Sequence, residues 1–246
     1  MPPIREVILI FAMEVEAMPA VKRLGLVRDE PHVTPGPAPC VTFSGAYAGL
    51  TLHAVWTGRD AAYGVDHVGT VPASLAAYVS LQAWPGTDLV ISAGTAGGFR
   101  SQGAAIGDVF VSTGKMHHDR RIPLPGFDKY GIGFIESVPT PNMCAALGLK
   151  AGIVSTGDSL DAVEADMAIM VEHGVAVKEM EAGSVAWVAA LFGKPALCIK
   201  AITDIVDGGR PAADEFQEHL NTAAAAIQAT LPRVAEFLGG RALDEL

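Results

Sequence analysis

Three acidic residues stand where an apolar stretch of the chain gives way to a helix or a turn: Glu16, Glu181 and Asp204. Acidic side chains in such places often only stabilise the positive end of a helix or close a turn. The functional alternative is acid–base chemistry, in which one carboxylate activates water and a second, protonated carboxyl group gives up its proton. Asp204 lies between apolar neighbours, so burial would raise its pKa and favour the second role.

A glycine-rich segment, residues 94–99, follows another apolar run and reads GTAGGF. We expect a tight turn there, whose backbone N–H groups either approach a ligand closely or serve only the turn itself. No Gly-Lys-Ser/Thr follows, so the segment is not a P-loop, and its glycine spacing is not that of a dinucleotide fingerprint. The segment predicts a close approach of the backbone without identifying the ligand.

Two adjacent histidines and an aspartate, residues 117–119, suggest a metal site. Neighbouring side chains on an extended strand point to opposite sides, and neither an HxxxH spacing nor a cysteine partner supports ligation. We therefore expect no metal here, and instead a hydrogen-bonded anchor for the loop that follows.

The segments that must position these side chains alternate between apolar runs and helical patterns. Runs typical of buried strands occupy residues 7–13, 50–57, 89–93, 108–113, 151–155 and 195–203. Helical patterns occupy residues 15–24, 65–83, 162–173, 182–192 and 214–238. This alternation predicts an α/β fold, a single domain over residues 1–246 with a central mixed β-sheet flanked by helices. Because ligand sites in such folds form at the carboxyl ends of strands, we expect the three acids at one edge of the sheet.

Composition disfavours several other kinds of function. Of the 246 residues, 50% are hydrophobic, which is enough for one sizeable core, and the formal net charge of −10 disfavours binding to nucleic acid or to an anionic membrane. Residues 67–87 carry no formally charged side chain, but their two prolines, histidine and glutamine favour a buried helix over a membrane span. The three cysteines are far apart and no signal peptide is visible, so we expect free thiols and a cytoplasmic location.

Several motifs, in their order and spacing, resemble the nucleoside phosphorylase and nucleosidase superfamily, and within it the plant-type 5′-methylthioadenosine nucleosidases. The resemblance runs from Ile8 to about Phe237 and rests on AMEVEA, GTAGGF, GDVFVSTGKMHHDRRIPLPGFDKYGIG, STGDSLDA, KEMEAGSVA and KAITDIVDG. It implies a nucleoside phosphorylase-like fold and hydrolysis of the N-glycosidic bond of 5′-methylthioadenosine to adenine and 5-methylthioribose, without a cofactor or a metal. Whether S-adenosylhomocysteine, with its bulkier charged tail, is also a substrate stays open at the level of sequence.

The resemblance also implies roles for individual residues. Glu16 matches the catalytic carboxylate that activates the attacking water, and Asp204 matches the catalytic acid that protonates adenine N7. Glu181 matches the acid that binds the ribose hydroxyls. The other residues implied to bind the substrate are Met13, Thr95, Gly97, Leu160, Lys178, Glu179, Met180 and Thr203.

Two other functions stay open at this level. Related phosphorylases hold phosphate with an arginine just before the glycine segment; Ser92 stands there in this chain, although Arg59 or the Arg120–Arg121 pair could take its place. A non-catalytic nucleoside-binding or storage protein would be expected to lack one of the three acids, and all three are present. The resemblance further implies a homodimer, in which residues 120–133 of one subunit close the substrate pocket of the other.

Overall fold

The computed structural model describes residues 1–246. Its strands are β1 (Glu6–Phe11), β2 (Val27–Arg28), β3 (Val41–Tyr47), β4 (Leu50–Trp56), β5 (Leu89–Gly98), β6 (Val109–His117), β7 (Ile135–Glu136), β8 (Lys150–Thr156), β9 (Val175–Glu179) and β10 (Ala196–Ile205). Its α-helices are α1 (Glu14–Leu24), α2 (Thr70–Ala83), α3 (Phe127–Ile132), α4 (Pro141–Leu147), α5 (Glu164–Glu172), α6 (Ala182–Leu191) and α7 (Ala212–Leu238).

All ten strands belong to one mixed sheet, ordered β10-β6-β8-β9-β5-β1-β4-β3-β2, with β7 beside β6. β10 also pairs with β5, so the part of the sheet formed by β5, β9, β8, β6 and β10 closes on itself. The pairs β1–β4, β1–β5, β5–β10, β6–β8 and β8–β9 are parallel, and the other pairs are antiparallel. The predicted α/β fold with a central mixed sheet is confirmed, whereas the closure of one half was not foreseen.

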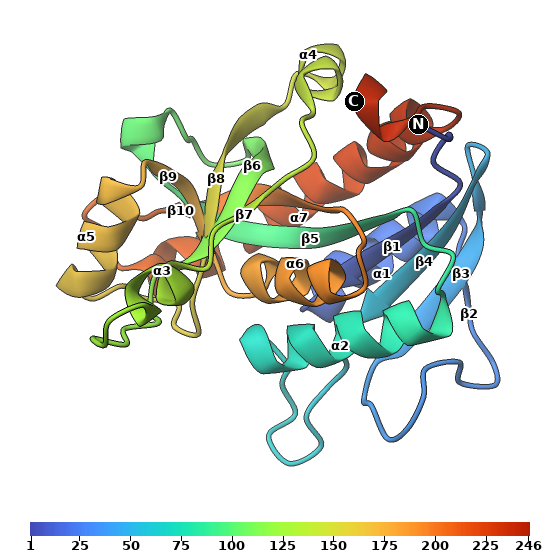
Figure 1. Cartoon of the computed structure of the whole chain (residues 1–246), viewed down its shortest axis with the longest axis horizontal. Helices are drawn as coiled ribbons and strands as arrows, with labels where there is room; N and C mark the ends of the chain where they lie inside the picture. Colours follow the sequence, from blue (N-terminus) through green and yellow to red (C-terminus); the bar gives the residue numbers. More distant parts are fainter.

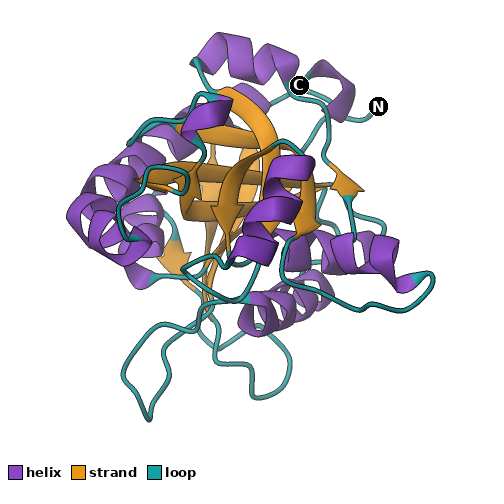
Figure 2. Cartoon of the chain, turned by 90° about the vertical axis from the view of Figure 1, so that its left-hand side faces the viewer, coloured by secondary structure: helices purple, strands orange, loops and turns teal.

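Helices cover the sheet on both faces, which is why its strands are apolar throughout. In β1, Val7, Leu9 and Phe11 join one core cluster, with residues of α1 and α7, whereas Ile8 and Ile10 join another, with residues of α2 and α6. Figure 1 shows α2 and α6 next to each other on one side of the sheet, and Figure 2 shows the strands enclosed by helices.

Each predicted strand and helix is present, but several boundaries differ. The helix predicted over residues 65–83 begins only at Thr70, because Gly69 before it has φ of 95° and the preceding segment folds as a loop. β6 continues beyond the predicted residue 113 to His117. The glycine-rich segment is not a tight turn: residues 94–98 are extended and form the end of β5.

The strand ranges predicted from the sequence lack β2, β3, β7 and β9. Of these, β3 pairs with β4 as an antiparallel hairpin. The turn between them consists of Ala48 and Gly49, with φ of 51° and 81°. Asparagine or glycine is the usual residue at the first of these positions, so an alanine there gives no turn signal. No helix of the chain combines the length and the apolar character that crossing a membrane requires.

Candidate active site

The site lies where β5 exchanges one neighbouring strand for another. β1 pairs with β5 as far as Ile10 opposite Ser92, and β9 pairs with it from Gly97 opposite Lys178. Between these pairings, one edge of β5 has no strand beside it, which is the arrangement that opens a crevice in α/β sheets. A cavity of about 290 Å³ occupies this place.

Fifteen residues line the cavity, and they come from segments far apart in the sequence. They are Ala12, Met13, Glu16, Val68, Thr95, Ala96, Gly97, Leu160, Lys178, Glu179, Met180, Glu181, Thr203, Asp204 and Phe216. The eleven residues to which the resemblance assigned a catalytic or substrate-binding role are all in this set, so the structure brings them together around one space. Their individual roles stay predictions. The four that were not named as site residues are Ala12, Val68, Ala96 and Phe216.

Glu16 is held at the start of α1 by three hydrogen bonds. Its Oε2 accepts the backbone N–H of Met13 at 3.2 Å, and its Oε1 accepts the backbone N–H and the hydroxyl of Thr95 at 2.6 and 2.7 Å. The first of these is the return bond of a glutamate in the third helical position. Burial raises the pKa of Glu16 to about 7, against the opposing effects of the Lys200 charge and the Thr95 hydrogen bonds. Such a group is suited to exchange a proton near neutral pH.

Asp204 lies beside an irregularity in β10. The pairing of β10 with β5 shifts between Ile202, opposite Ala96, and Asp204, opposite Gly97, so Thr203 is an extra residue. The Thr203 hydroxyl lies 3.0 Å from the Ala96 carbonyl oxygen and 2.7 Å from Oδ1 of Asp204. Bulges of this kind re-aim side chains next to active sites. Burial raises the pKa of Asp204, although the Thr203 hydrogen bond opposes the shift. Asp204 therefore holds its proton to a higher pH than an exposed aspartate does.

Two glycines of β5 are required by the two carboxyl groups. A Cβ on Gly97 would lie 2.6 Å from Oδ2 of Asp204, and a Cβ on Gly94 would lie 2.9 Å from both carboxylate oxygens of Glu16. Gly94 also has φ of 157°, close to extended backbone. The expected close approach of the backbone is present, and it accommodates the protein's own acids.

Glu181 is the third acid, and a buried cation lies against it. Its Oε1 accepts the backbone N–H of Gly69 at 3.0 Å, and its Oε2 lies 3.3 Å from Nζ of Lys200. Burial raises the pKa of Glu181, the charge of Lys200 lowers it, and the charge of Glu179 raises it further, so that the net shift is upward. The two contacts fix the direction of the carboxyl group at the wall of the cavity.

Glu179 lines the cavity, but its carboxylate serves the fold. It accepts the backbone N–H groups of Glu181 and Ala182 at 2.9 and 2.8 Å, accepts the hydroxyl of Thr156, and pairs with Nζ of Lys200 at 3.0 Å. Burial opposes its ionisation, but Lys200, Thr156 and the backbone N–H groups outweigh burial and hold the pKa of Glu179 below its usual value. Glu179 thus caps α6 and fixes Lys200 in the position from which it also reaches Glu181.

Lys200 is the functional candidate that sequence reasoning missed. It is 2% exposed, in the middle of β10, and pairs with two carboxylates; these partners together raise the pKa of its ammonium group above the ordinary value, although burial opposes them. A signal existed, because a lysine inside an otherwise apolar strand must find buried partners. The sequence could not say which acids these would be.

The remaining wall of the cavity is largely apolar. Met13, Met180 and Phe216 contribute to it, and Leu160 is 42% exposed at its border. Lys178 donates to the carbonyl oxygens of Ser159 and Leu160 at 2.6 and 2.9 Å. Its ammonium group therefore holds the segment that carries Leu160.

The two adjacent histidines are buried away from the cavity. Nδ1 of His118 lies 2.9 Å from Oγ of Ser155, and a Cβ on Gly183 would lie 2.9 Å from the His117 ring. His118 thus ties the end of β6 to β8, as an anchor would. No group of three or more His, Cys, Asp or Glu side chains has an arrangement that could hold a metal ion.

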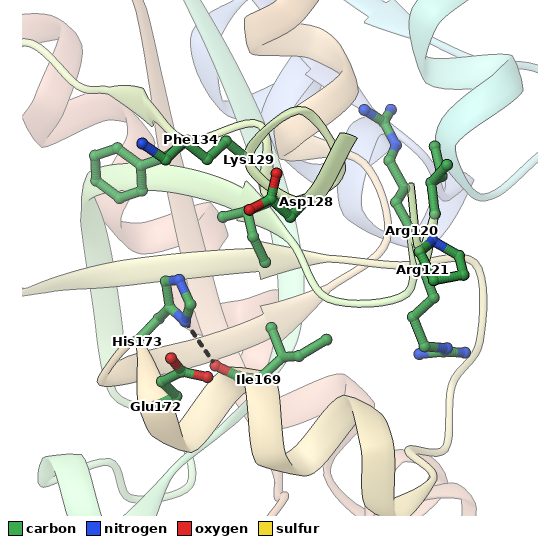
Figure 3. A pocket seen from close by; sticks show the side chains of 11 residues that line it. Arg120, Arg121, Asp128, Lys129, Phe134, Ile169, Glu172 and His173 are labelled. Atoms are coloured by element: carbon green, nitrogen blue, oxygen red, sulfur yellow. Dashed lines mark hydrogen bonds between the residues drawn. The ribbon is translucent and has the colours of Figure 1, made fainter. Parts of the chain in front are cut away.

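A second, wider cavity of about 960 Å³ lies beside α3 and α5. Figure 3 shows that the guanidinium groups of Arg120 and Arg121 point in opposite directions, and Arg121 pairs with Asp166. On the α5 side, Glu172 and His173 lie at the far end of the cavity, and the His173 ring bonds the Ile169 carbonyl oxygen at 3.1 Å. The charged groups at the two ends of this cavity therefore do not converge on one point.

Comparison with known proteins agrees with this geometry. Residues 6–236 match the Phosphorylase superfamily. A 5′-methylthioadenosine nucleosidase of Arabidopsis thaliana is 43% identical, over 99% of this chain and 91% of its own length, and a 5′-methylthioadenosine/S-adenosylhomocysteine nucleosidase of the same plant is 43% identical, over 99% and 96%. The apo structure of the Arabidopsis thaliana 5′-methylthioadenosine nucleosidase superposes with a TM-score of 0.96, at 43% identity and over 99% of this chain and 100% of that one. With this fold, this cavity and this similarity over its whole length, the chain belongs to the phosphorylase superfamily and, within it, to the plant-type 5′-methylthioadenosine nucleosidases.

Proposed function

We propose that the chain, as a single nucleosidase domain, hydrolyses the N-glycosidic bond of 5′-methylthioadenosine and releases adenine and 5-methylthioribose. The observation that carries the proposal is the convergence of Glu16, Glu181 and Asp204 on one cavity of about 290 Å³. The volume is close to the lower end of the range for small-molecule sites, which suits a nucleoside with a short 5′ substituent.

In this proposal the base end of the cavity supplies a proton. Adenine is a poor leaving group as an anion, so the proton of Asp204 passes to N7 as the bond between C1′ and N9 breaks. The electron pair of that bond stays on the purine, which leaves as neutral adenine. Burial, which raises the pKa of Asp204, keeps the proton available, and Gly97 leaves room for Oδ2. General-acid help of this kind is worth roughly 10²–10⁴-fold in rate.

The opposite end supplies the nucleophile. Loss of the purine gives the sugar oxocarbenium-ion character, as in other glycoside hydrolyses. A water oxygen forms the new bond to C1′, and Glu16 accepts the proton that the water gives up. Glu181 accepts hydrogen bonds from the ribose hydroxyls, and its contacts with Gly69 and Lys200 hold it ready to do so.

Phosphorolysis finds no support among the lining residues. Lys178 is the only cation among them, and its ammonium group bonds two carbonyl oxygens. Ser92 is buried in β5 and does not line the cavity, and neither do Arg59, Arg120 and Arg121. A phosphate ion would therefore enter an acidic site without a free partner.

The test is adenine release from 5′-methylthioadenosine in phosphate-free buffer that contains a chelator, followed by ultraviolet absorbance. We expect full turnover without phosphate and no increase when phosphate is added. Product that forms only with phosphate would identify a phosphorylase, and ligand binding without turnover under either condition would identify a non-catalytic binding protein.

We propose S-adenosylhomocysteine as a second substrate, because one of the two Arabidopsis relatives with 43% identity is named for both nucleosides. The measurement is adenine release from each nucleoside at matched concentrations. Turnover of 5′-methylthioadenosine alone would restrict the chain to the smaller substrate.

We propose that the active form is a homodimer. Apolar side chains are exposed along α2 and α6 and on the segment around α3, and burial against a second copy would remove them from water: Val71, Leu75, Tyr78, Trp187, Leu191, Leu124, Phe127 and Tyr130. In the proposed dimer, residues 120–133 close the partner's substrate pocket. Sedimentation at a series of concentrations, with activity measured at each, tests this. A monomer that keeps full specific activity at high dilution would contradict it.

We propose that the protein acts in the cytoplasm, where its substrates would be small soluble nucleosides. Its three cysteines are unpaired, and burial raises the pKa of Cys40 to about 11, which suits unreactive thiols in a reducing compartment. Fluorescent tagging and cell fractionation test the location, and recovery in an oxidising compartment would contradict it.

A further inference from the structure

The backbone that carries Asp204 is fixed from both sides. On the side of β5, the Thr203 hydroxyl reaches the Ala96 carbonyl oxygen at the bulge. On the other side, the backbone N–H of Ile205 donates to Oε2 of Glu215 at 2.8 Å. Ile205 follows Asp204 directly, so the Glu215 carboxylate holds the peptide group immediately after the proposed acid.

Glu215 is a buried acidic side chain that the mechanism above does not use. It lies in the first turn of α7 and is 7% exposed. Its Oε1 lies 3.5 Å from Nη1 of Arg210, whose side chain is about half exposed and also pairs with the exposed Glu218 at 2.7 Å. This counter-ion is exposed to solvent and shared with Glu218, so it offsets only part of the negative charge of Glu215. The next residue, Phe216, lines the cavity.

We infer that Glu215 is a positioning residue for Asp204: its carboxylate fixes the backbone behind the acid, and its negative charge keeps the proton on Asp204 until the purine receives it. The inference rests on the proposed function, in which Asp204 protonates N7. A second negative charge close to a carboxyl group disfavours ionisation of that group, so the proton is retained to higher pH.

Of the charged groups that affect Asp204, Glu215 is the one that raises its pKa. β5 presents Gly97, which has no side chain, and β9 presents Lys178, whose charge lowers the pKa of Asp204 although its ammonium group bonds two carbonyl oxygens. In the turn after β10, Asp207 accepts the backbone N–H groups of Arg100 and Ser101 at 2.7 and 3.0 Å. Burial raises the pKa of Asp204 most, and Glu215 is the charged group that raises it further.

The test compares Glu215→Gln with the full-length wild type. A glutamine carbonyl oxygen can still accept the Ile205 N–H, so the substitution removes the charge and keeps the anchor. The measured quantity is the inhibition constant of adenine as a function of pH, with 7-deazaadenine as the matched probe. Because 7-deazaadenine lacks N7, the ratio of the two inhibition constants reports the proton on Asp204 and cancels the titration of Glu16 and Glu181.

As pH rises, the advantage of adenine over 7-deazaadenine should disappear with a midpoint at the pKa of Asp204. In Glu215→Gln we expect this midpoint to lie roughly half a unit to one unit lower than in wild type. Glu218→Gln, which changes the exposed partner of Arg210, should leave this midpoint unchanged. Arg210→Gln removes the counter-ion of Glu215 and should move the midpoint the opposite way, by less. This exposed substitution keeps the inference testable if Glu215→Gln does not fold.

An unchanged midpoint in folded Glu215→Gln, or a downward shift in Arg210→Gln, would overturn the inference. This result can be distinguished from a failure of the proposed function. If wild type does not hydrolyse 5′-methylthioadenosine, or if Asp204→Asn keeps full turnover, then the proposed function fails. If both of those expectations hold and the midpoint does not move, then only the role of Glu215 fails.

Discussion

At one end of the cavity, Glu181 and the neighbouring Glu179 share the buried ammonium group of Lys200, whereas Asp204 at the other end makes no ion pair. At the first end, Lys200 and the hydrogen bonds to the carboxylate hold the pKa of Glu179 below its usual value, whereas burial and the Glu179 charge leave the pKa of Glu181 raised. At the second end, burial and the Glu215 charge raise the pKa of Asp204, against the Thr203 hydrogen bond and the Lys178 charge. Glu16 differs from both, because burial raises its pKa to about 7 while the Lys200 charge and the Thr95 hydrogen bonds oppose the shift. Environments thus separate the roles of identical chemical groups, as in other enzymes with paired carboxyl groups.

The sharpest way to break the contrast is to remove the proton donor. Asp204→Asn keeps the shape of the side chain but has no acidic proton, so we expect turnover of 5′-methylthioadenosine to fall by about 10³-fold. Ligand binding, measured by calorimetry, should persist, because the amide group can still donate a hydrogen bond to N7. Asp214→Asn, an exposed neighbour in α7, is the matched control. Turnover within a few-fold of wild type in Asp204→Asn would contradict the role of Asp204 as the proton donor.

Glu16→Gln tests the proposed base, and we expect a loss of roughly 10²-fold or more in turnover. In wild type, kcat/KM should rise with pH through about 7, because Glu16 must lose its proton to act as a base.

The raised pKa of Glu16 also predicts that the folded chain holds a proton between about pH 4.5 and 7 that the unfolded chain has released, so stability falls as pH rises through this window.

Urea unfolding at several pH values measures that effect. Glu16→Gln should remove a pH-dependent loss of stability on the order of 2 to 3 kcal/mol. A wild-type activity profile that is flat across neutral pH would contradict the assignment of Glu16 as the base. An identical pH dependence of stability in wild type and variant would contradict its raised pKa.

Lys200→Met tests the charge balance at the other end. It leaves the two buried acids, Glu179 and Glu181, without their counter-ion, and breaking a buried pair in this way costs about 3–5 kcal/mol of stability. Urea unfolding near neutral pH measures the loss, with the exposed Lys22→Met as control. At low pH, where Glu179 and Glu181 become protonated, the difference from wild type should shrink. A loss that stays constant with pH would indicate a packing defect and no charge effect.

The smallest expected effect comes from crowding the acid without changing it. Gly97→Ala places a Cβ 2.6 Å from Oδ2 of Asp204 and 2.8 Å from Cγ2 of Val206, so the carboxyl group must move. Since a displacement of about 1 Å can cost up to 10²-fold, we expect kcat to fall by roughly ten-fold or more with little change in KM. Gly45→Ala is the control, because the added Cβ would lie 3.0 Å from the flexible end of Leu26 and 3.5 Å, an ordinary contact distance, from the nearest backbone atoms. Equal kcat values in Gly97→Ala and wild type would show that Asp204 needs no such space.

The sequence by itself determined the fold class, because apolar runs without alternation require a sheet that helices cover on both faces, as the opposite directions of Val7 and Ile8 in β1 confirm. It also indicated eleven of the fifteen residues around the cavity, because motif order and spacing carry that information in a known family. The sequence did not fix where every element begins, because the start of α2 depends on the backbone of Gly69. It also did not reveal the β3–β4 hairpin, whose turn uses an alanine.

Only the tertiary structure decided what surrounds each acid. The pairing of Lys200 with Glu179 and Glu181 joins β10 to the end of β9, and the bond from Glu215 to Ile205 joins α7 to β10. The closure of β5, β9, β8, β6 and β10 brings these segments together, and no local pattern in the sequence specifies it. The pKa of a carboxyl group depends on burial and on charges within a few ångströms, so it is a property of the folded chain.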